Sequence, residues 1–171
     1  FGSTGVIGTK TLLLIKSHFP NIKVNLLTAN NNYRKLIQQV EIFKPKYVFI
    51  KNSNYINLLR SKINKKIKIL EENELIYYLN NSQSDFSVLA ISGYQSLIFL
   101  KPIILNTKNL GIVNKECIVS AGHLIYKLIK KSNTKIFPLD SEHFSLKKYF
   151  NNKELEYKKI FITASGGPFY K

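Results

Sequence analysis

Three glycines near the start of the chain, Gly2, Gly5 and Gly8, form a GxxGxxG pattern ahead of an apolar, helix-like stretch. Glycines at this spacing permit a tight turn and let the backbone approach a pyrophosphate closely. The N–H groups and the positive dipole end of the following helix then favour the phosphate charge. The pattern therefore indicates dinucleotide binding, although a glycine-rich turn of purely structural origin has the same composition.

The stretch after the next expected strand bears on the choice of cofactor. NAD-binding domains place an acidic residue there to hold the ribose 2′-hydroxyl, whereas NADP-binding domains offer polar or cationic groups to the 2′-phosphate. Here the strand leads into Asn30, Asn31 and Asn32. Arg34 follows, and no acidic residue occurs before Glu41. The sequence favours NADP over NAD, with an ordinary asparagine-rich turn as the structural alternative.

Short polar motifs follow three later strands of the expected sheet. Their sequences are Asn114-Lys115-Glu116, Asp140-Ser141-Glu142-His143 and Ser165-Gly166-Gly167-Pro168-Phe169. Open parallel sheets bind ligands at the carboxyl ends of their strands. We therefore expect the three motifs to lie at one edge of the sheet.

The two carboxylates of the second motif have the chemistry of a metal site. Asp140 and Glu142 are hard oxygen donors two positions apart, which suits Mg²⁺ or Mn²⁺ completed by another carboxylate, water and substrate oxygens. The structural alternative is that Asp140 or Ser141 caps a helix beginning near Glu142.

The other two motifs admit both functional and structural interpretations. Ser165, before two glycines, could present its hydroxyl and backbone N–H groups to a phosphate, and Lys115 could contact a phosphate or hydroxyl. A plain turn and a solvated lysine are the alternatives. Asn114 and Glu116 could simply cap the helix that follows them.

The elements that position these residues alternate regularly along the chain. Strands are expected at residues 23–29, 47–50, 66–70, 86–91, 110–113, 135–137 and 160–163. Helices are expected at residues 6–17, 33–43, 55–63, 72–79, 94–106, 116–131 and 142–150. This alternation predicts an α/β fold in which a Rossmann-like, doubly wound parallel sheet is covered by helices on both faces.

Composition restricts the other function classes. The net charge of +16 invites a nucleic-acid partner, but the lysines are scattered and form no basic face interleaved with aromatic residues. The richness in Lys, Ile, Asn and Tyr is also typical of an A/T-rich genome. We therefore expect no nucleic-acid partner. The absence of a long uncharged apolar run predicts no membrane span, and the single cysteine, Cys117, suits a reducing compartment.

Two other classes stay open. Short-chain dehydrogenases combine a glycine turn with a Tyr-x-x-x-Lys pair. The matching pairs here are Tyr47 with Lys51, Tyr126 with Lys130 and Tyr149 with Lys153. A chain rich in tyrosine and lysine produces this spacing by chance, so a metal-independent short-chain reductase is the alternative enzyme. The other alternative is a basic binding protein without enzymatic activity.

Taken together and in this order, the motifs resemble the 1-deoxy-D-xylulose 5-phosphate reductoisomerase family over essentially the whole chain. The matching stretches are Gly2-Ser3-Thr4-Gly5-Val6-Ile7-Gly8, Phe43-Lys44-Pro45, Asn114-Lys115-Glu116, Val119-Ser120-Ala121-Gly122, Pro138-Leu139-Asp140-Ser141-Glu142-His143 and Thr163-Ala164-Ser165-Gly166-Gly167-Pro168-Phe169.

The resemblance implies an NADPH- and divalent-metal-dependent enzyme of non-mevalonate isoprenoid biosynthesis. It would rearrange 1-deoxy-D-xylulose 5-phosphate, a small phosphorylated sugar, and reduce the product by hydride transfer to 2-C-methyl-D-erythritol 4-phosphate. The metal would be Mg²⁺ or Mn²⁺, with Co²⁺ as a further option. The full-length protein would be a homodimer of the bacterial cytoplasm, with a plastid-type organelle as the alternative location.

The resemblance also assigns roles to residues. The residues implied to contact NADPH are Thr4, Gly5, Val6, Ile7, Asn30, Asn31, Asn32, Asn114 and Glu116. Asp140 and Glu142 would bind the metal. The substrate would be held by Lys115, Ser141, Glu142 and Ser165, with Lys115 and Glu142 in catalytic roles.

The chain departs from the family pattern at the glycine turn and at the asparagines. The family has serine in place of Val6, glycine in place of Asn30 and a basic residue near Asn31, which bears on the 2′-phosphate contact. We expect a fragment, with an NADPH-binding domain at residues 1–139 that lacks most of its first strand. The truncated start of an α+β catalytic domain would occupy residues 140–171. A third metal carboxylate and a lid would lie beyond Lys171, so we expect this piece alone to be inactive.

Overall fold

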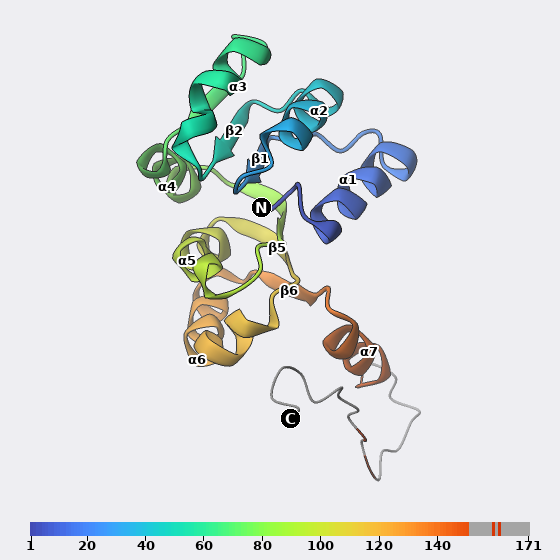
Figure 1. Cartoon of the computed structure of the whole chain (residues 1–171). Helices are drawn as coiled ribbons and strands as arrows, with labels where there is room; N and C mark the ends of the chain where they lie inside the picture. Colours follow the sequence, from blue (N-terminus) through green and yellow to red (C-terminus); the bar gives the residue numbers. More distant parts are fainter. Residues whose placement is uncertain (151–158, 160, 162–171) are drawn as a thin grey trace, which may run out of the picture.

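The computed structural model describes residues 1–150, 159 and 161, and its strands and helices alternate as predicted (Figure 1). The strands are β1 (Leu26–Ala29), β2 (Tyr47–Ile50), β3 (Lys68–Leu70), β4 (Ser84–Leu89), β5 (Thr107–Ile112) and β6 (Lys135–Pro138). The helices are α1 (Val6–His18), α2 (Tyr33–Phe43), α3 (Ile56–Lys62), α4 (Glu72–Asn81), α5 (Leu97–Leu105), α6 (Lys115–Ser132) and α7 (Ser141–Phe150). The strand expected at residues 160–163 lies outside the described residues except for Phe161.

Two of the expected helices begin with a short 3-10 turn instead of α-helix. These turns are η1 (Ser53–Tyr55) and η2 (Tyr94–Ser96). The Asn52 side chain accepts a hydrogen bond from the Asn54 backbone at 3.1 Å, and Ser96 Oγ donates to the Gly93 carbonyl at 3.0 Å. Such local side-chain bonds compete with α-helical hydrogen bonding, so the α-helix proper starts later than the apolar pattern predicts.

The parallel sheet is divided into two three-stranded sheets, with strand orders β1-β2-β3 and β4-β5-β6. The predicted Rossmann-like parallel arrangement holds, because the start of the chain connects the two sheets. Residues 1–3 run between the two sheets and bond to both. The Ser3 N–H donates to the Thr28 carbonyl at 2.8 Å, and the Ala90 N–H donates to the Phe1 carbonyl at 2.9 Å. Figure 1 shows the chain start at this junction. The α/β class, with parallel pairing throughout these strands, is confirmed.

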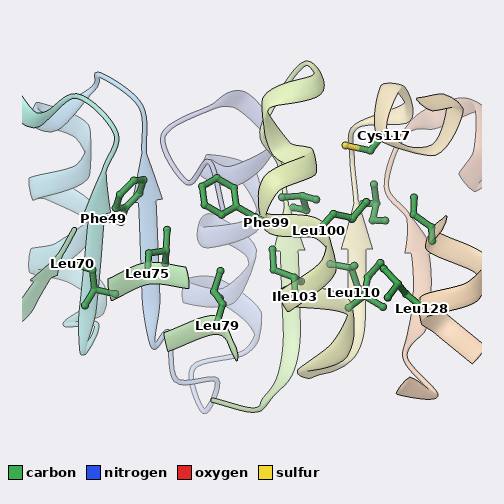
Figure 2. Packing of buried hydrophobic residues seen from close by; sticks show 14 residues of the cluster. Phe49, Leu70, Leu75, Leu79, Phe99, Leu100, Ile103, Leu110, Cys117 and Leu128 are labelled. Atoms are coloured by element: carbon green, nitrogen blue, oxygen red, sulfur yellow. The ribbon is translucent and has the colours of Figure 1, made fainter. Parts of the chain in front are cut away.

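Side-chain alternation along the strands separates two hydrophobic cores. In β2, Val48 and Ile50 are buried on the side of α1, α2 and α3, whereas Phe49 belongs to the other cluster. Because successive residues of a strand point to opposite faces, one apolar strand serves both cores. Figure 2 shows the second cluster, where Phe49 and Leu75 lie toward Phe99 across the division between the sheets. This cluster joins the two sheets into one folded unit.

The most apolar helix, α5, is a core element. Its buried residues are Phe99, Leu100, Pro102, Ile103 and Ile104. It has 9 residues, about half the length that a membrane span needs. Across the described part of the chain, no helix combines the length and apolarity needed to cross a bilayer.

Candidate functional site

A crevice of about 620 Å³ opens at the carboxyl ends of β1, β2 and β4, beside the glycine turn. Its walls combine glycines and polar residues with apolar side chains. The lining residues are Phe1, Gly2, Thr4, Gly5, Thr28, Ala29, Asn30, Phe49, Lys51, Leu75, Ala90, Ile91, Ser92, Tyr94, Gln95, Ile98 and Phe99. Its position at the strand ends, where the two sheets meet, is the usual ligand-binding place of an open α/β sheet.

The glycine turn is compact because its backbone approaches neighbouring segments closely. Gly2 has a φ of 75°, and a Cβ there would lie 2.5 Å from the Ala90 carbonyl oxygen. A Cβ on Gly8 would collide with the Gly2 carbonyl oxygen and the backbone of Ser3. Gly5 is the N-cap of α1 and has no side chain to satisfy the first N–H groups of the helix. Gly5 also lines the crevice, so α1 begins beside it, and free N–H groups at a helix start suit an anion.

The predicted contacts of the turn divide into two groups. Thr4 and Gly5 line the crevice. Val6 and Ile7 are not among its lining residues, and the Val6 side chain is 72% exposed. Val6 and Ile7 can instead contact a ligand through their backbone N–H groups, which lie in the first turn of α1.

A buried glutamine, which the sequence interpretation missed, braces this turn. Ser3 Oγ donates to Gln39 Oε1 at 2.7 Å, and Gln39 Nε2 donates to the Ser3 carbonyl at 2.8 Å. Gln39 belongs to α2 and lies between the buried Leu36 and Val40. The signal for this role was a polar residue on the apolar face of a helix.

The three asparagines after β1 have different environments. Asn30 lines the crevice. Asn31 Oδ1 accepts from Asn52 Nδ2 at 3.0 Å, and Asn32 caps α2 by accepting from the Lys35 backbone at 3.1 Å. The structural alternative of an asparagine-rich turn therefore describes Asn31 and Asn32, while Asn30 stays a direct candidate for cofactor contact.

A second pocket of about 250 Å³ adjoins the crevice, sharing Ala90, Ile91 and Ser92 with it. Its other lining residues are Val113, Asn114, Lys115, Glu116 and Asp140. Two of the three predicted motifs thus meet at one edge of the sheet, as expected. Ser165 and the motif around it lie outside the described residues.

Asn114 is buried and its amide holds the loops of this edge together. Its Nδ2 donates to the carbonyls of Ile91 and Gly93, at 2.8 and 2.6 Å, and its Oδ1 accepts from the Cys117 backbone at 3.2 Å. Asn114 is therefore the N-cap of α6 and also fixes the loop after β4. Glu116, exposed in the first turn of α6, faces the pocket without such ties.

Asp140 lines the second pocket, Glu142 is paired with the lining residue Lys115, and both carboxylates already have hydrogen-bond partners. Asp140 Oδ1 accepts from the His143 backbone at 2.9 Å, so Asp140 caps α7, and it also lies 2.7 Å from His143 Nδ1. Glu142 Oε1 lies 3.5 Å from Lys115 Nζ, and its Oε2 accepts from Ser141 Oγ at 3.0 Å. Lys115, Ser141 and Glu142 therefore form one polar group at this edge.

Both carboxyl groups are held in the ionised form. Partial burial acts to raise the pKa of Asp140, but hydrogen bonds from the His143 backbone and ring outweigh it and lower the pKa. For Glu142, a hydrogen bond to its own backbone N–H, the Ser141 hydroxyl and the charge of Lys115 lower the pKa. Ionised oxygen donors are what a hard divalent cation requires.

The described residues supply some of the ligands of a divalent-metal site. Within residues 1–150, 159 and 161, no group of three or more His, Cys, Asp or Glu side chains could hold a metal ion. Mg²⁺ is commonly bound through one or two carboxylates and keeps several waters, so Asp140 and Glu142 suit a site completed by other oxygens.

Lys153, and with it the Tyr149–Lys153 pair, lies outside the described residues, and the other two Tyr-x-x-x-Lys pairs do not assemble a second kind of site. Lys130 Nζ lies 4.5 Å from the ring centroid of Tyr126 on the exposed side of α6. Tyr47 packs against Tyr78, and only Lys51 of its pair lines the crevice. The geometry therefore does not support a short-chain dehydrogenase site.

The parallel sheets, the glycine turn and the crevice at the strand ends define a Rossmann-like α/β domain. Residues 1–122 match the family model described as 1-deoxy-D-xylulose 5-phosphate reductoisomerase, and residues 136–171 match the model of the C-terminal domain of that enzyme. The chain belongs to the 1-deoxy-D-xylulose 5-phosphate reductoisomerase family, so the resemblance in the motifs is confirmed.

Individual relatives and solved structures agree with this assignment. The reductoisomerase of Pelagibacter ubique is 43% identical over 99% of this chain and 45% of its own length. That of Thermoanaerobacter pseudethanolicus is 36% identical over 98% of this chain and 44% of its own length. The chain thus spans just under half the length of these relatives.

The structural neighbours include the reductoisomerase from Zymomonas mobilis in complex with NADPH. It has a TM-score of 0.76 and 29% sequence identity, covering 83% of this chain and 38% of that one. A reductoisomerase in complex with NADPH, fosmidomycin and magnesium has a TM-score of 0.75 and 30% identity, covering 83% of this chain and 36% of that one.

Proposed function

We propose that this chain forms the cofactor-binding part, and the beginning of the catalytic part, of an NADPH- and divalent-metal-dependent reductoisomerase. The whole enzyme converts 1-deoxy-D-xylulose 5-phosphate to 2-C-methyl-D-erythritol 4-phosphate in isoprenoid biosynthesis. The observation that carries this proposal is the adjacency of two pockets. The crevice at the glycine turn and the pocket bearing Asp140 share Ala90, Ile91 and Ser92, so a cofactor in one lies next to a substrate in the other.

The residues of the crevice bind and orient the cofactor. Thr4, Gly5 and the first N–H groups of α1 receive the pyrophosphate, and Asn30 faces the adenosine side. Glu116 and the loop held by Asn114 border the passage toward the second pocket.

The residues proposed to hold the substrate and the metal are Asp140 and Lys115 of the second pocket, Ser141 and Glu142 beside Lys115, and Ser165, which lies outside the described residues. Asp140 and Glu142 are the metal ligands, while Lys115, Ser141 and Glu142 contact the substrate, with Ser165 on its phosphate. Lys115 also neutralises Glu142, from which its ammonium group lies 3.5 Å away. When bound, the metal acts as a Lewis acid and template for the rearrangement, and NADPH supplies the hydride.

Further properties are proposed from the family. The metal is Mg²⁺ or Mn²⁺, and solved reductoisomerase structures similar to this chain contain magnesium. The full-length protein is proposed to be a cytoplasmic homodimer.

Two measurements test the function. Titration of the 171-residue chain with NADPH, followed by the fluorescence of the reduced nicotinamide, should show saturable binding. The complete protein should oxidise NADPH in the presence of deoxyxylulose phosphate and Mg²⁺ or Mn²⁺. This oxidation should stop when the metal is chelated. This chain alone should show no turnover, because the described residues offer two metal carboxylates at most. Failure of the chain to bind NADPH would refute the assignment of the crevice.

A further inference from the structure

A dinucleotide that carries a 2′-phosphate needs a cationic or strongly polar partner near the end of the strand that follows the glycine turn. The segment after β1 supplies asparagines, of which only Asn30 lines the crevice. Arg34 points instead to its neighbour, with Nε donating to the Tyr33 hydroxyl at 3.1 Å. Among the lining residues of the crevice, Lys51 is the one with a charged side chain.

The register of the sheet places Lys51 beside Asn30. β1 and β2 pair in parallel, with Ala29 opposite Ile50. Beyond the last ladder pair, the Lys51 N–H donates to the Ala29 carbonyl at 3.0 Å, and the Asn52 N–H donates to the Asn30 carbonyl at 3.1 Å. Lys51 therefore stands at the end of the neighbouring strand, next to the position where the 2′ substituent of a bound dinucleotide is read.

The ammonium group of Lys51 is engaged by a carboxylate that a phosphate can replace. Lys51 Nζ donates to both carboxylate oxygens of Glu72, at 2.8 and 2.7 Å. The two side chains are 49% and 45% exposed, and ion pairs this exposed are weak. Glu72 also lies in the first turn of α4, where the helix dipole stabilises its negative charge after Lys51 leaves.

We propose that Lys51 is the residue that recognises the 2′-phosphate of NADPH in this chain, with Glu72 as the anion it exchanges for that phosphate. This inference rests on the proposed cofactor site and names the residue that sets its specificity. Lys51 takes the role for which the sequence interpretation considered the asparagines after β1. The Lys51–Glu72 pair then neutralises the lysine while the crevice is empty, and a cofactor without the 2′-phosphate cannot compete for it.

The test compares NADPH with NADH on matched variants of the 171-residue chain. Lys51→Ala should weaken NADPH binding about tenfold, the low end for loss of a hydrogen bond to a charged group, and leave NADH binding unchanged. Lys51→Arg should retain the preference for NADPH. Glu72→Gln should tighten NADPH binding by about twofold to threefold, since it removes a competing exposed ion pair.

The control is Lys68→Ala. Lys68, in β3, forms an ion pair with Glu74, which lies on α4 as Glu72 does, and Lys68 Nζ is 2.8 Å from the carboxylate. The exposure of this pair is similar to that of Lys51 and Glu72, but Lys68 does not line the crevice. Lys68→Ala should leave the dissociation constants of both NADPH and NADH unchanged. Equal weakening of NADPH and NADH by Lys51→Ala, or no weakening of either, would overturn the assignment while leaving the cofactor site intact. A wild-type chain that binds neither nucleotide would overturn the proposed cofactor site and this assignment with it.

Discussion

Ser3 and Gln39 hold each other through two hydrogen bonds, one from the Ser3 hydroxyl to Gln39 Oε1 and one from Gln39 Nε2 to the Ser3 carbonyl. Ser3 is part of the glycine turn and Gln39 is part of α2, so the bonds join segments that are 36 positions apart. Both residues are buried, and hydrogen bonds in such places are costly to lose because water cannot replace them. The shape of the turn that opens α1 therefore depends on a residue of the next helix.

Replacing Gln39 with alanine should destabilise the fold and loosen the turn. The variant removes the shorter of the two side-chain hydrogen bonds to the Ser3 carbonyl, that from Gln39 at 2.8 Å, and leaves the one from Thr9 Oγ1 at 3.4 Å, at a cost of about 1–3 kcal/mol in the free energy of unfolding. NADPH binding should weaken as well, because the turn is no longer held in the shape that receives a pyrophosphate. Chemical denaturation and the nucleotide titration measure the two effects. Gln38→Ala, a change of the same kind at an exposed neighbouring position, should alter neither.

Replacing Gly8 with alanine should disrupt the turn from the opposite side. The added methyl group would collide with the Gly2 carbonyl oxygen and with backbone atoms of Ser3, which cannot move aside as a flexible side chain can. Overpacking of this kind costs about 1–3 kcal/mol or more. A thermal unfolding midpoint that stays at the wild-type value would show that the turn has room for a methyl group at position 8. Gly122→Ala, where no atom lies within 4 Å of the added carbon, should be neutral or slightly stabilising.

The sequence predicted well those elements whose pattern is local. β2 and α2 have the predicted bounds, because an apolar run of strand length and a helical apolar face are both visible in a few neighbouring residues. The hydrogen-bond partner of Gln39 and the position of Lys51 beside Asn30 were not predictable in this way. Each depends on the register or packing of segments that are distant in sequence. Without the positions of those segments, a polar residue is expected to lie on the surface. The order of the strands within each sheet also depends on which strands pair, which periodicity does not specify.

Stability should depend on pH through Glu74, whose pKa is lowered from its ordinary value of 4.5 by a hydrogen bond from Lys68 and by the Glu71 backbone N–H. A lowered folded-state pKa stabilises the fold above the unfolded value, and this contribution is lost as the pH falls through the folded value. Lys68→Ala should therefore reduce the loss of stability as the pH falls below the ordinary Glu pKa of 4.5. Urea denaturation at several pH values measures this loss. Lys65→Ala removes the same charge from an exposed position and should keep the wild-type pH dependence.

Asp140 caps α7 and is also proposed as a metal ligand, and replacement by asparagine separates these two roles. Asparagine caps helices as well as aspartate does, so the acceptor for the His143 backbone N–H is kept. The carboxylate that a hard cation requires is lost. In the complete protein, Asp140→Asn should change the unfolding free energy by less than about 0.5 kcal/mol. Its affinity for Mg²⁺ should fall by at least the roughly 10–100-fold that loss of a supporting residue costs.

Two companion variants make this prediction for Asp140 decisive. Asp140→Ala removes both roles and should lose about 1 kcal/mol of stability together with the metal affinity. Asp85→Asn alters an exposed carboxylate that is paired with Lys108, away from both pockets, and should leave metal binding unchanged. Calorimetric titration with Mg²⁺ and Mn²⁺ measures the affinities. If Asp140→Asn binds either metal as the wild-type protein does, Asp140 is a helix cap and not a ligand.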